Sequence, residues 1–142
     1  MLLLLLASTA GCLSYSDDSS DIVEEIPPNT VYITSKGFTP RQLTVGVNET
    51  VTWVNKDSLT HWVASAQHPT HTIYCENQNC GAIGSYQGSL ACLGEGETKD
   101  GAFDACRPLN SGESYEFKFN KTGTWQYHDH LDYGLVGSIR VE

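Results

Sequence analysis

The feature of this sequence that most limits its possible folds is a repeated alternation of apolar and polar residues. Residues 42–47 and 50–55 alternate on either side of a turn at Asn48-Glu49, and the segment 113–119 carries aromatic residues on one side and charges on the other. A period of two places successive side chains on opposite faces of a strand. No segment of about ten or more residues has the pattern of a convincing amphipathic helix. Further short strand candidates occupy 31–34, 61–65, 124–128 and 136–141.

About seven short strands separated by turns predict an all-β chain folded as an antiparallel sandwich. We expect Trp53, Phe117 and Trp125 to contribute to the core between the sheets. The length of 142 residues suits one domain with a core of ordinary size. The net charge of −9 argues against nucleic acid as a partner, because binding to phosphates needs clustered cations.

The N-terminal sequence MLLLLLASTAG is a short apolar run that ends in small residues directly before Cys12. It is too short to span a bilayer, and residues 1–11 are typical of a secretory signal peptide. The ending Ala10-Gly11-Cys12 resembles a bacterial lipoprotein signal, in which the cysteine becomes the lipidated first residue. An ordinary cleaved signal peptide is the alternative. Both interpretations predict an exported protein in the periplasm or at the cell surface. The lipoprotein interpretation adds a lipid anchor on Cys12 as the one contact with a membrane.

Residues 12–29 are predicted to form a tether. They carry five acidic and no basic residues and end just after Pro27-Pro28. Such a segment cannot bury enough apolar surface to fold, and it can hold a domain away from a membrane surface. The folded domain is therefore expected to span 30–142.

The strand pattern disappears over 72–112, which we interpret as an insertion rich in Gly, Asn, Ser and Cys. Its four cysteines are Cys75, Cys80, Cys92 and Cys106. An exported chain can form disulfides, and four cysteines allow three pairings, of which we favour Cys75–Cys80 with Cys92–Cys106. A thiolate metal site is the alternative, although the spacings form no CxxC pair. Because the expected strands lie outside the insertion, its reduction is predicted to loosen the insertion before the sandwich unfolds.

All five histidines fall in two short windows of the sequence: His61, His68 and His71 in the first, and His128 and His130 in the second. Residues two apart in a strand point to the same side, so that His128 and His130 can converge on one ion. Several imidazoles without a soft ligand suit Cu(II) well, and zinc is not excluded. Asp129 and Asp132 can hydrogen-bond to imidazole N–H groups or ligate the ion directly.

Three segments resemble cupredoxins, in the order in which they occur along the chain. The sequence 51–65, VTWVNKDSLTHWVAS, resembles the segment that supplies the first histidine ligand of that family, and 123–141, GTWQYHDHLDYGLVGSIRV, resembles the last two strands and the ligand loop between them. Gly37-Phe38-Thr39-Pro40 before a strand is also typical of the family. The resemblance covers about 30–142 without the insertion. It implies a Greek-key β-sandwich with copper near one end and His61 as a ligand.

The ligand loop departs from the cupredoxin pattern, in which a Cys is followed by a His three positions on and a Met three further. In one register Asp129, Asp132 and Leu135 take these three positions. In the other register His130 takes the His position and Tyr127 the Cys position. Neither register supplies a thiolate or a thioether, so that a blue copper centre is not expected.

A second resemblance implies a different copper site. Residues 124–130 are similar to the Tyr-His-x-His strand of multicopper oxidases, where both histidines bind copper of the non-blue kind, and His61-Trp62 is similar to their His-Trp segment. The combination with His-Pro-Thr-His also resembles a group of secreted bacterial cupredoxin-like proteins. Together these resemblances imply an all-histidine copper site drawn from the five histidines.

Three functions follow as hypotheses. The favoured one is a copper-binding module for extracytoplasmic copper handling or electron transfer, with a redox or copper-transfer protein as a possible partner and no catalytic activity of its own. The second is a small copper enzyme acting on oxygen species, which would need an open coordination position. The third is a binding or structural domain that kept the sandwich and lost the metal.

Overall fold

The computed structural model describes residues 24–65, 74–75, 91–98 and 101–142. All regular secondary structure within these ranges is β-strand. The strands are β1 (Thr30–Thr34), β2 (Gly37–Thr39), β3 (Gln42–Val45), β4 (Thr50–Asn55), β5 (Val63–Ser65), β6 (Cys92–Gly94), β7 (Glu97–Thr98), β8 (Ser114–Lys118), β9 (Gly123–Asp129) and β10 (Val136–Val141). The signal peptide, Cys12 and the tether up to residue 23 lie outside the described residues. No helix able to cross a bilayer occurs in the part of the chain that the structure describes.

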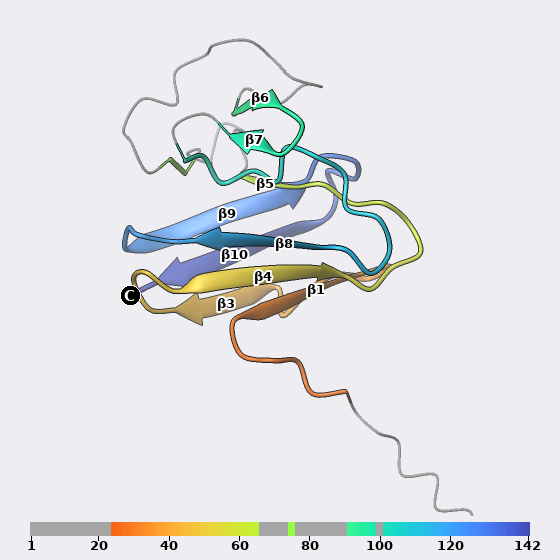
Figure 1. Ribbon diagram of the computed structural model, residues 1–142. Helices are drawn as coiled ribbons and strands as arrows, with labels where there is room; N and C mark the ends of the chain where they lie inside the picture. Colours follow the sequence, from red (N-terminus) through yellow and green to blue (C-terminus); the bar gives the residue numbers. More distant parts are fainter. Residues whose placement is uncertain (1–23, 66–73, 76–90, 99–100) are drawn as a thin grey trace, which may run out of the picture.

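Two four-stranded sheets pack face to face and form the body of the molecule (Figure 1). One sheet has the strand order β2-β1-β4-β8 and the other β3-β10-β9-β5. The pairs β1–β4 and β3–β10 are parallel, and the other neighbours in these sheets are antiparallel. The predicted β-sandwich is confirmed, but its sheets are mixed. The parallel pair β1–β4 arises because the chain crosses to the other sheet, as β3, between these two strands.

The core lies between the two sheets and is rich in aromatic residues. Trp53 of β4 is fully buried, and its ring centroid lies 5.4 Å from that of Tyr127 on β9, across the sandwich. Phe117 of β8 and Trp125 of β9 are partly buried and pack against this core. The prediction that Trp53, Phe117 and Trp125 contribute to the core is confirmed.

The insertion also supplies core residues. Tyr74, Phe103 and Leu109 are fully buried and belong to the same cluster as the strand residues of both sheets. The strands of the two four-stranded sheets lie outside 72–112, as expected, but the core between these sheets includes residues of the insertion. Its apolar residues form short, irregularly spaced groups between glycine and polar residues, so that no period of two or 3.6 marks them in the sequence.

Backbone pairing explains how these residues reach the core. The segment 101–109 runs along the edge of β5 that β9 leaves free: the N–H of Ser65 donates to the carbonyl of Phe103 (2.8 Å), and the N–H of Ala105 donates to the carbonyl of Val63 (2.9 Å). His61 and Leu109 exchange two further backbone hydrogen bonds (3.1 and 2.7 Å). This part of the insertion thus extends the β3-β10-β9-β5 sheet.

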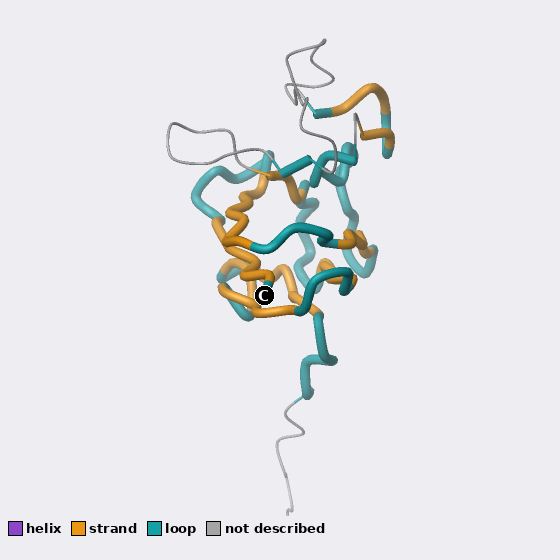
Figure 2. Tube along the Cα trace, turned by 90° about the vertical axis from the view of Figure 1, so that its left-hand side faces the viewer, coloured by secondary structure: helices purple, strands orange, loops and turns teal. Residues whose placement is uncertain are grey.

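A disulfide between Cys92 and Cys106, with Cα atoms 5.5 Å apart, ties the β6–β7 hairpin to the end of this paired segment. Figures 1 and 2 show the hairpin outside the two layers of the sandwich. The predicted Cys92–Cys106 pair is confirmed. Cys75 is disulfide-bonded as well, and Cys80 lies outside the described residues.

The connection from the insertion into β8 is held by Glu113. Its carboxylate accepts a hydrogen bond from the N–H of Asn110 (2.7 Å) and forms an ion pair with Arg107 (3.2 Å). The N–H of Asn110, together with the Arg107 guanidinium, holds the pKa of Glu113 below its ordinary value.

Candidate metal centre

One end of the sandwich brings together three ionisable residues from the loop after β4, the residues before β5 and the end of β9. His61 Nδ1 lies 2.6 Å from Asp129 Oδ2, and His61 Nε2 lies 3.2 Å from Asp57 Oδ2. The exposed fractions are 4% for His61, 9% for Asp57 and 0% for Asp129. An ionised carboxylate only accepts hydrogen bonds, so that between two ionised carboxylates the ring would donate from both nitrogens. We call this unit the Asp57–His61–Asp129 triad.

Backbone donors fix both carboxylates of the triad. The second oxygen of Asp129 accepts from the N–H of Trp62 (2.8 Å) and the N–H of Leu131 (2.9 Å). Asp57 accepts from the N–H of Ser58 (2.6 Å). Burial raises the pKa of Asp57, but the N–H of Ser58 and the His61 ring lower it by more, so that this pKa lies below its ordinary value.

The loop that carries Asp57 is shaped by a buried amide. Asn55 ends β4 with no exposed surface. Its side-chain oxygen accepts from the N–H of Asp57 (2.8 Å), and its amide nitrogen donates to the carbonyls of Leu59 (2.7 Å) and Leu109 (3.0 Å). One side chain thereby joins the loop after β4 to the insertion and holds Asp57 and His61 on the same turn.

The other two described histidines form a separate cluster. The rings of His128 and His130 stack with centroids 4.8 Å apart and planes 12° from parallel. Trp62 stacks on the far side of His130 at 5.3 Å, and the ring of Tyr133 lies 5.6 Å from that of His128. The prediction that His128 and His130 share one side of the strand is confirmed. We call these two residues the histidine pair.

The triad and the histidine pair lie on opposite faces of the last residues of β9. Tyr127 points into the core, and alternation along a strand places Asp129 on that same face and His128 on the other. Burial raises the pKa of the Tyr127 hydroxyl, which keeps this inner face free of a phenolate. The structure therefore does not bring His61 together with the histidine pair, although the sequence analysis assigned the three to one ion.

The remaining predicted site residues are placed as follows. Asp129 bonds to His61 rather than to either member of the histidine pair. Asp132 is exposed and closes the turn before β10, since its carboxylate accepts from the N–H of Gly134 (3.0 Å). His68 and His71 lie outside the described residues.

Asp57 was not among the residues predicted for the site. Its sequence signals are its position four residues before His61 and its place in the segment 51–65 that resembles cupredoxins. Within the described ranges, a group of three possible ligand atoms lying within 4.8 Å of one another comes from Cys92, Asp104 and Cys106. It cannot hold a metal in this form, because the two sulfurs are joined in the disulfide.

The residues at the sandwich end do not fit a blue copper ion. The structure agrees with the register in which Asp129 takes the Cys position of the cupredoxin loop, because Asp129 contacts His61 while Tyr127 lies in the core. Asp132 and Leu135 then take the His and Met positions. No sulfur ligand is present in this register, and both nitrogens of His61 face carboxylates.

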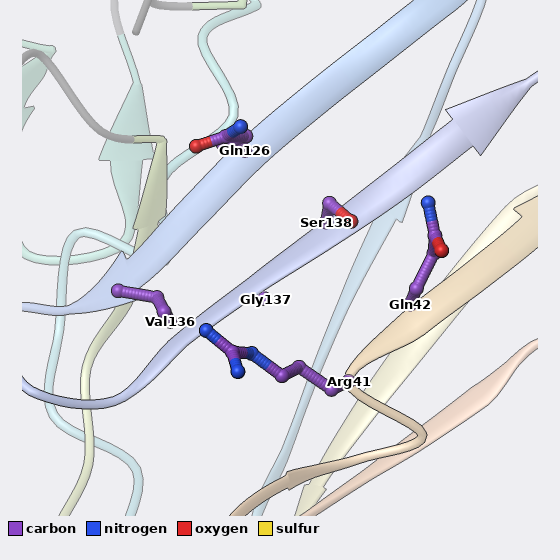
Figure 3. Close-up of a pocket in the computed structure, with 6 residues that line it drawn as sticks. All are labelled: Arg41, Gln42, Gln126, Val136, Gly137 and Ser138. Carbon is purple, nitrogen blue, oxygen red and sulfur yellow. The ribbon is translucent and has the colours of Figure 1, made fainter. Parts of the chain in front are cut away.

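A depression of about 280 Å³ lies on the outer face of this sheet, over β3, β9 and β10 (Figure 3). Ser138 of β10 lies between Gln42 of β3 and Gln126 of β9, with which it pairs in register, and Arg41 reaches over Val136 and Gly137. No histidine lines this depression, so that it coincides with neither the triad nor the histidine pair.

Comparison with known proteins identifies the fold. No protein-family model matches the sequence, and no curated protein matches it. Among solved structures, a purple cupredoxin from Nitrosopumilus maritimus superposes with a TM-score of 0.54 at 21% identity, covering 80% of this chain and 98% of that one. A reduced amicyanin mutant, in which a tryptophan is replaced by tyrosine, superposes with a TM-score of 0.53 at 19% identity, covering 86% of this chain and 87% of that one. The described residues therefore form a cupredoxin-like domain.

Proposed function

We propose that this protein is an extracytoplasmic copper-binding protein of copper handling or electron transfer, with a histidine-rich, non-blue site. The observation that carries the proposal is the histidine pair. Two imidazoles are held at one end of β9 by stacking on each other, with Trp62 against one of them and Tyr133 against the other. A neutral imidazole offers one ring nitrogen to a metal, and two such rings at the end of β9 suit Cu(II) better than a hard cation.

The comparisons support copper as the ion in a general way. A structure similar to this one is described as the reduced Cu(I) form of an amicyanin mutant. The absence of any thiolate or thioether in the ligand loop supports a non-blue site. His68 and His71 remain predicted additional ligands, and His61 is a ligand only if it leaves its two carboxylates.

The proposed location rests on the N-terminal sequence and on the cysteines. A signal peptide over 1–11, with Cys12 as the lipid anchor, would place the domain in the periplasm or at the cell surface. The Cys92–Cys106 disulfide agrees with an oxidising compartment. In the cell, Cys12→Ser should release the protein from the membrane fraction.

Titration of the purified protein with Cu(II) tests the copper proposal. The wild type should bind copper with nitrogen hyperfine structure in its electron paramagnetic resonance spectrum and without the intense thiolate absorption near roughly 600 nm. Binding should weaken as the pH falls through about 6.5, where free imidazole is protonated. A parallel titration with Zn(II), and competition between the two ions, decides which metal the site prefers.

The variants locate the site. Replacing His128 and His130 together by Asn should abolish tight binding, whereas Gln126→Ala is the matched control, since Gln126 is an exposed residue two positions before His128 on the same face of β9. Unchanged copper binding in the double variant would refute the assignment. A wild type that binds neither metal would favour the metal-free binding or structural domain, the alternative that the closed triad supports.

A further inference from the structure

We propose that the Asp57–His61–Asp129 triad is a metal-independent clasp: an ion-paired unit that closes the end of the sandwich and keeps metal ions out of it. The cupredoxin resemblance leads one to expect an ion at this place, held partly by His61. The structure instead holds three mutually satisfied side chains there. This inference does not depend on copper binding by the histidine pair, which lies on the other face of β9.

The exclusion of a metal follows from the hydrogen bonds of His61. A histidine binds a metal through a ring nitrogen that carries no proton. Both nitrogens of His61 lie within hydrogen-bond distance of a carboxylate, at 2.6 and 3.2 Å. An incoming cation would have to displace a proton and a buried ion pair. The positions that would add an imidazole and a thioether are filled by Asp132 and Leu135.

Backbone donors surround both carboxylates of the triad and suit their ionised form. Asp129 has no exposed surface and accepts three hydrogen bonds, from the His61 ring and from the N–H groups of Trp62 and Leu131. Asp57 accepts from the N–H of Ser58 as well as from His61. A buried carboxylate is tolerated when its oxygens are hydrogen-bonded and a cation is next to it. Both conditions are met for both carboxylates.

The clasp joins parts of the chain that are far apart in sequence. Asp129 and His61 are 68 positions apart, and they connect the end of β9 to the segment that leads into β5. Asp57 adds the loop after β4, which belongs to the opposite sheet. A single buried imidazolium thereby ties the two layers of the sandwich together at this end, as a metal ion would. Removing one partner of such a unit leaves a buried charge uncompensated, which is more damaging than losing an exposed ion pair.

Thermal unfolding of the full chain in excess chelator tests the clasp. The wild type should unfold cooperatively without metal. His61→Gln and Asp129→Asn should each lower the midpoint by about 10 °C or more. Asp132→Asn is the matched control, an exposed carboxylate three residues from Asp129, and should shift the midpoint by less than roughly 3 °C. Asp57→Asn keeps one acceptor oxygen at the most exposed member of the triad. It is the variant to measure if the other two variants do not fold.

Two further measurements separate a clasp from a hidden metal site. Nitrogen-15 NMR of the wild-type imidazoles in chelator should show protons on both nitrogens of His61 at neutral pH. The copper stoichiometry and paramagnetic spectrum should be the same in Asp57→Asn as in the wild type. One unprotonated His61 nitrogen, a changed copper spectrum in Asp57→Asn, or a His61→Gln protein as stable as the wild type would overturn the inference. If the histidine pair binds no copper at all, the proposed function fails while the unfolding and NMR results still decide the clasp.

Discussion

Phe103→Ala is the substitution that most directly tests whether the insertion is part of the sandwich core. Phe103 lies in the cysteine-rich insertion, yet its side chain has no exposed surface. Its ring centroid lies 5.0 to 6.2 Å from those of five aromatic side chains on the strands and their ends. These are Trp53, Tyr115, Phe117, Phe119 and Tyr127.

The expected cost can be worked out in two ways. A buried phenylalanine removes on the order of 150 Å² from water, which at about 25 cal/mol per Å² contributes roughly 4 kcal/mol. Truncations of buried phenylalanine to alanine cost about 3–5 kcal/mol, including the cavity left behind. The two figures agree, and a loss of this size is a large fraction of the roughly 5–15 kcal/mol by which a domain is stable.

Urea unfolding followed by tryptophan fluorescence and circular dichroism measures this loss. Phe103→Ala should lower the free energy of unfolding by about 3–5 kcal/mol, with an unchanged dependence on urea. Leu93→Ala is the matched control, because Leu93 lies in the same insertion but is 60% exposed, and it should change the free energy by less than about 0.5 kcal/mol. If Phe103→Ala cost less than about 1 kcal/mol, the insertion would not be part of the core. If the variant is unfolded, Phe103→Leu gives a smaller, measurable loss.

Three further predictions concern the insertion and its surroundings. Replacing Cys92 and Cys106 by Ser should lower the free energy of unfolding by about 3 kcal/mol on the loop-entropy model. Because the segment before Cys106 pairs with β5, fluorescence and circular dichroism should still report one shared transition rather than an early loosening of the insertion. Because the pKa of Glu113 is lowered in the folded protein, its ionised form stabilises the fold at pH values above the ordinary glutamate pKa near 4.3. This contribution is lost as the pH falls through the lower pKa of the folded protein. Glu113→Gln should therefore flatten that part of a plot of stability against pH. Tyr74→Phe should cost about 1–2 kcal/mol in urea unfolding, because the Tyr74 hydroxyl donates to the side chain of Asn120 (2.5 Å) and accepts from its N–H (2.8 Å).

Local patterns in the sequence predicted the strands that have one buried and one exposed face. Val51 and Trp53 are buried and alternate with half-buried neighbours along β4, and the pair His128 and His130 followed from the same period of two. The sequence did not predict β2, which has three residues and follows a turn. It also did not predict the core residues of the insertion, because their burial depends on backbone pairing with β5, about 40 residues away.

The triad escaped prediction for a related reason. Its strongest hydrogen bond joins two residues 68 positions apart, and no short spacing encodes such a contact. The sequence showed a histidine at a cupredoxin ligand position and aspartates at two others, which is equally compatible with a carboxylate-rich metal site. The structure distinguishes the two, because it shows the carboxylates on both nitrogens of the one ring.

The tripeptide His128-Asp129-His130 serves two chemically different faces of one strand. The central carboxylate turns inward and completes the triad, while the flanking imidazoles turn outward and stack. Trp62 secures both sides, since its N–H donates to Asp129 and its ring stacks on His130. A strand has a side-chain period of two, so that a slip of β9 by one residue would turn the carboxylate to the outer face of the sheet and both imidazoles to the core face. The six antiparallel pairs between β9 and β10 fix the register against such a slip. The same pairing that closes the sandwich therefore also keeps His128 and His130 on the face opposite the triad.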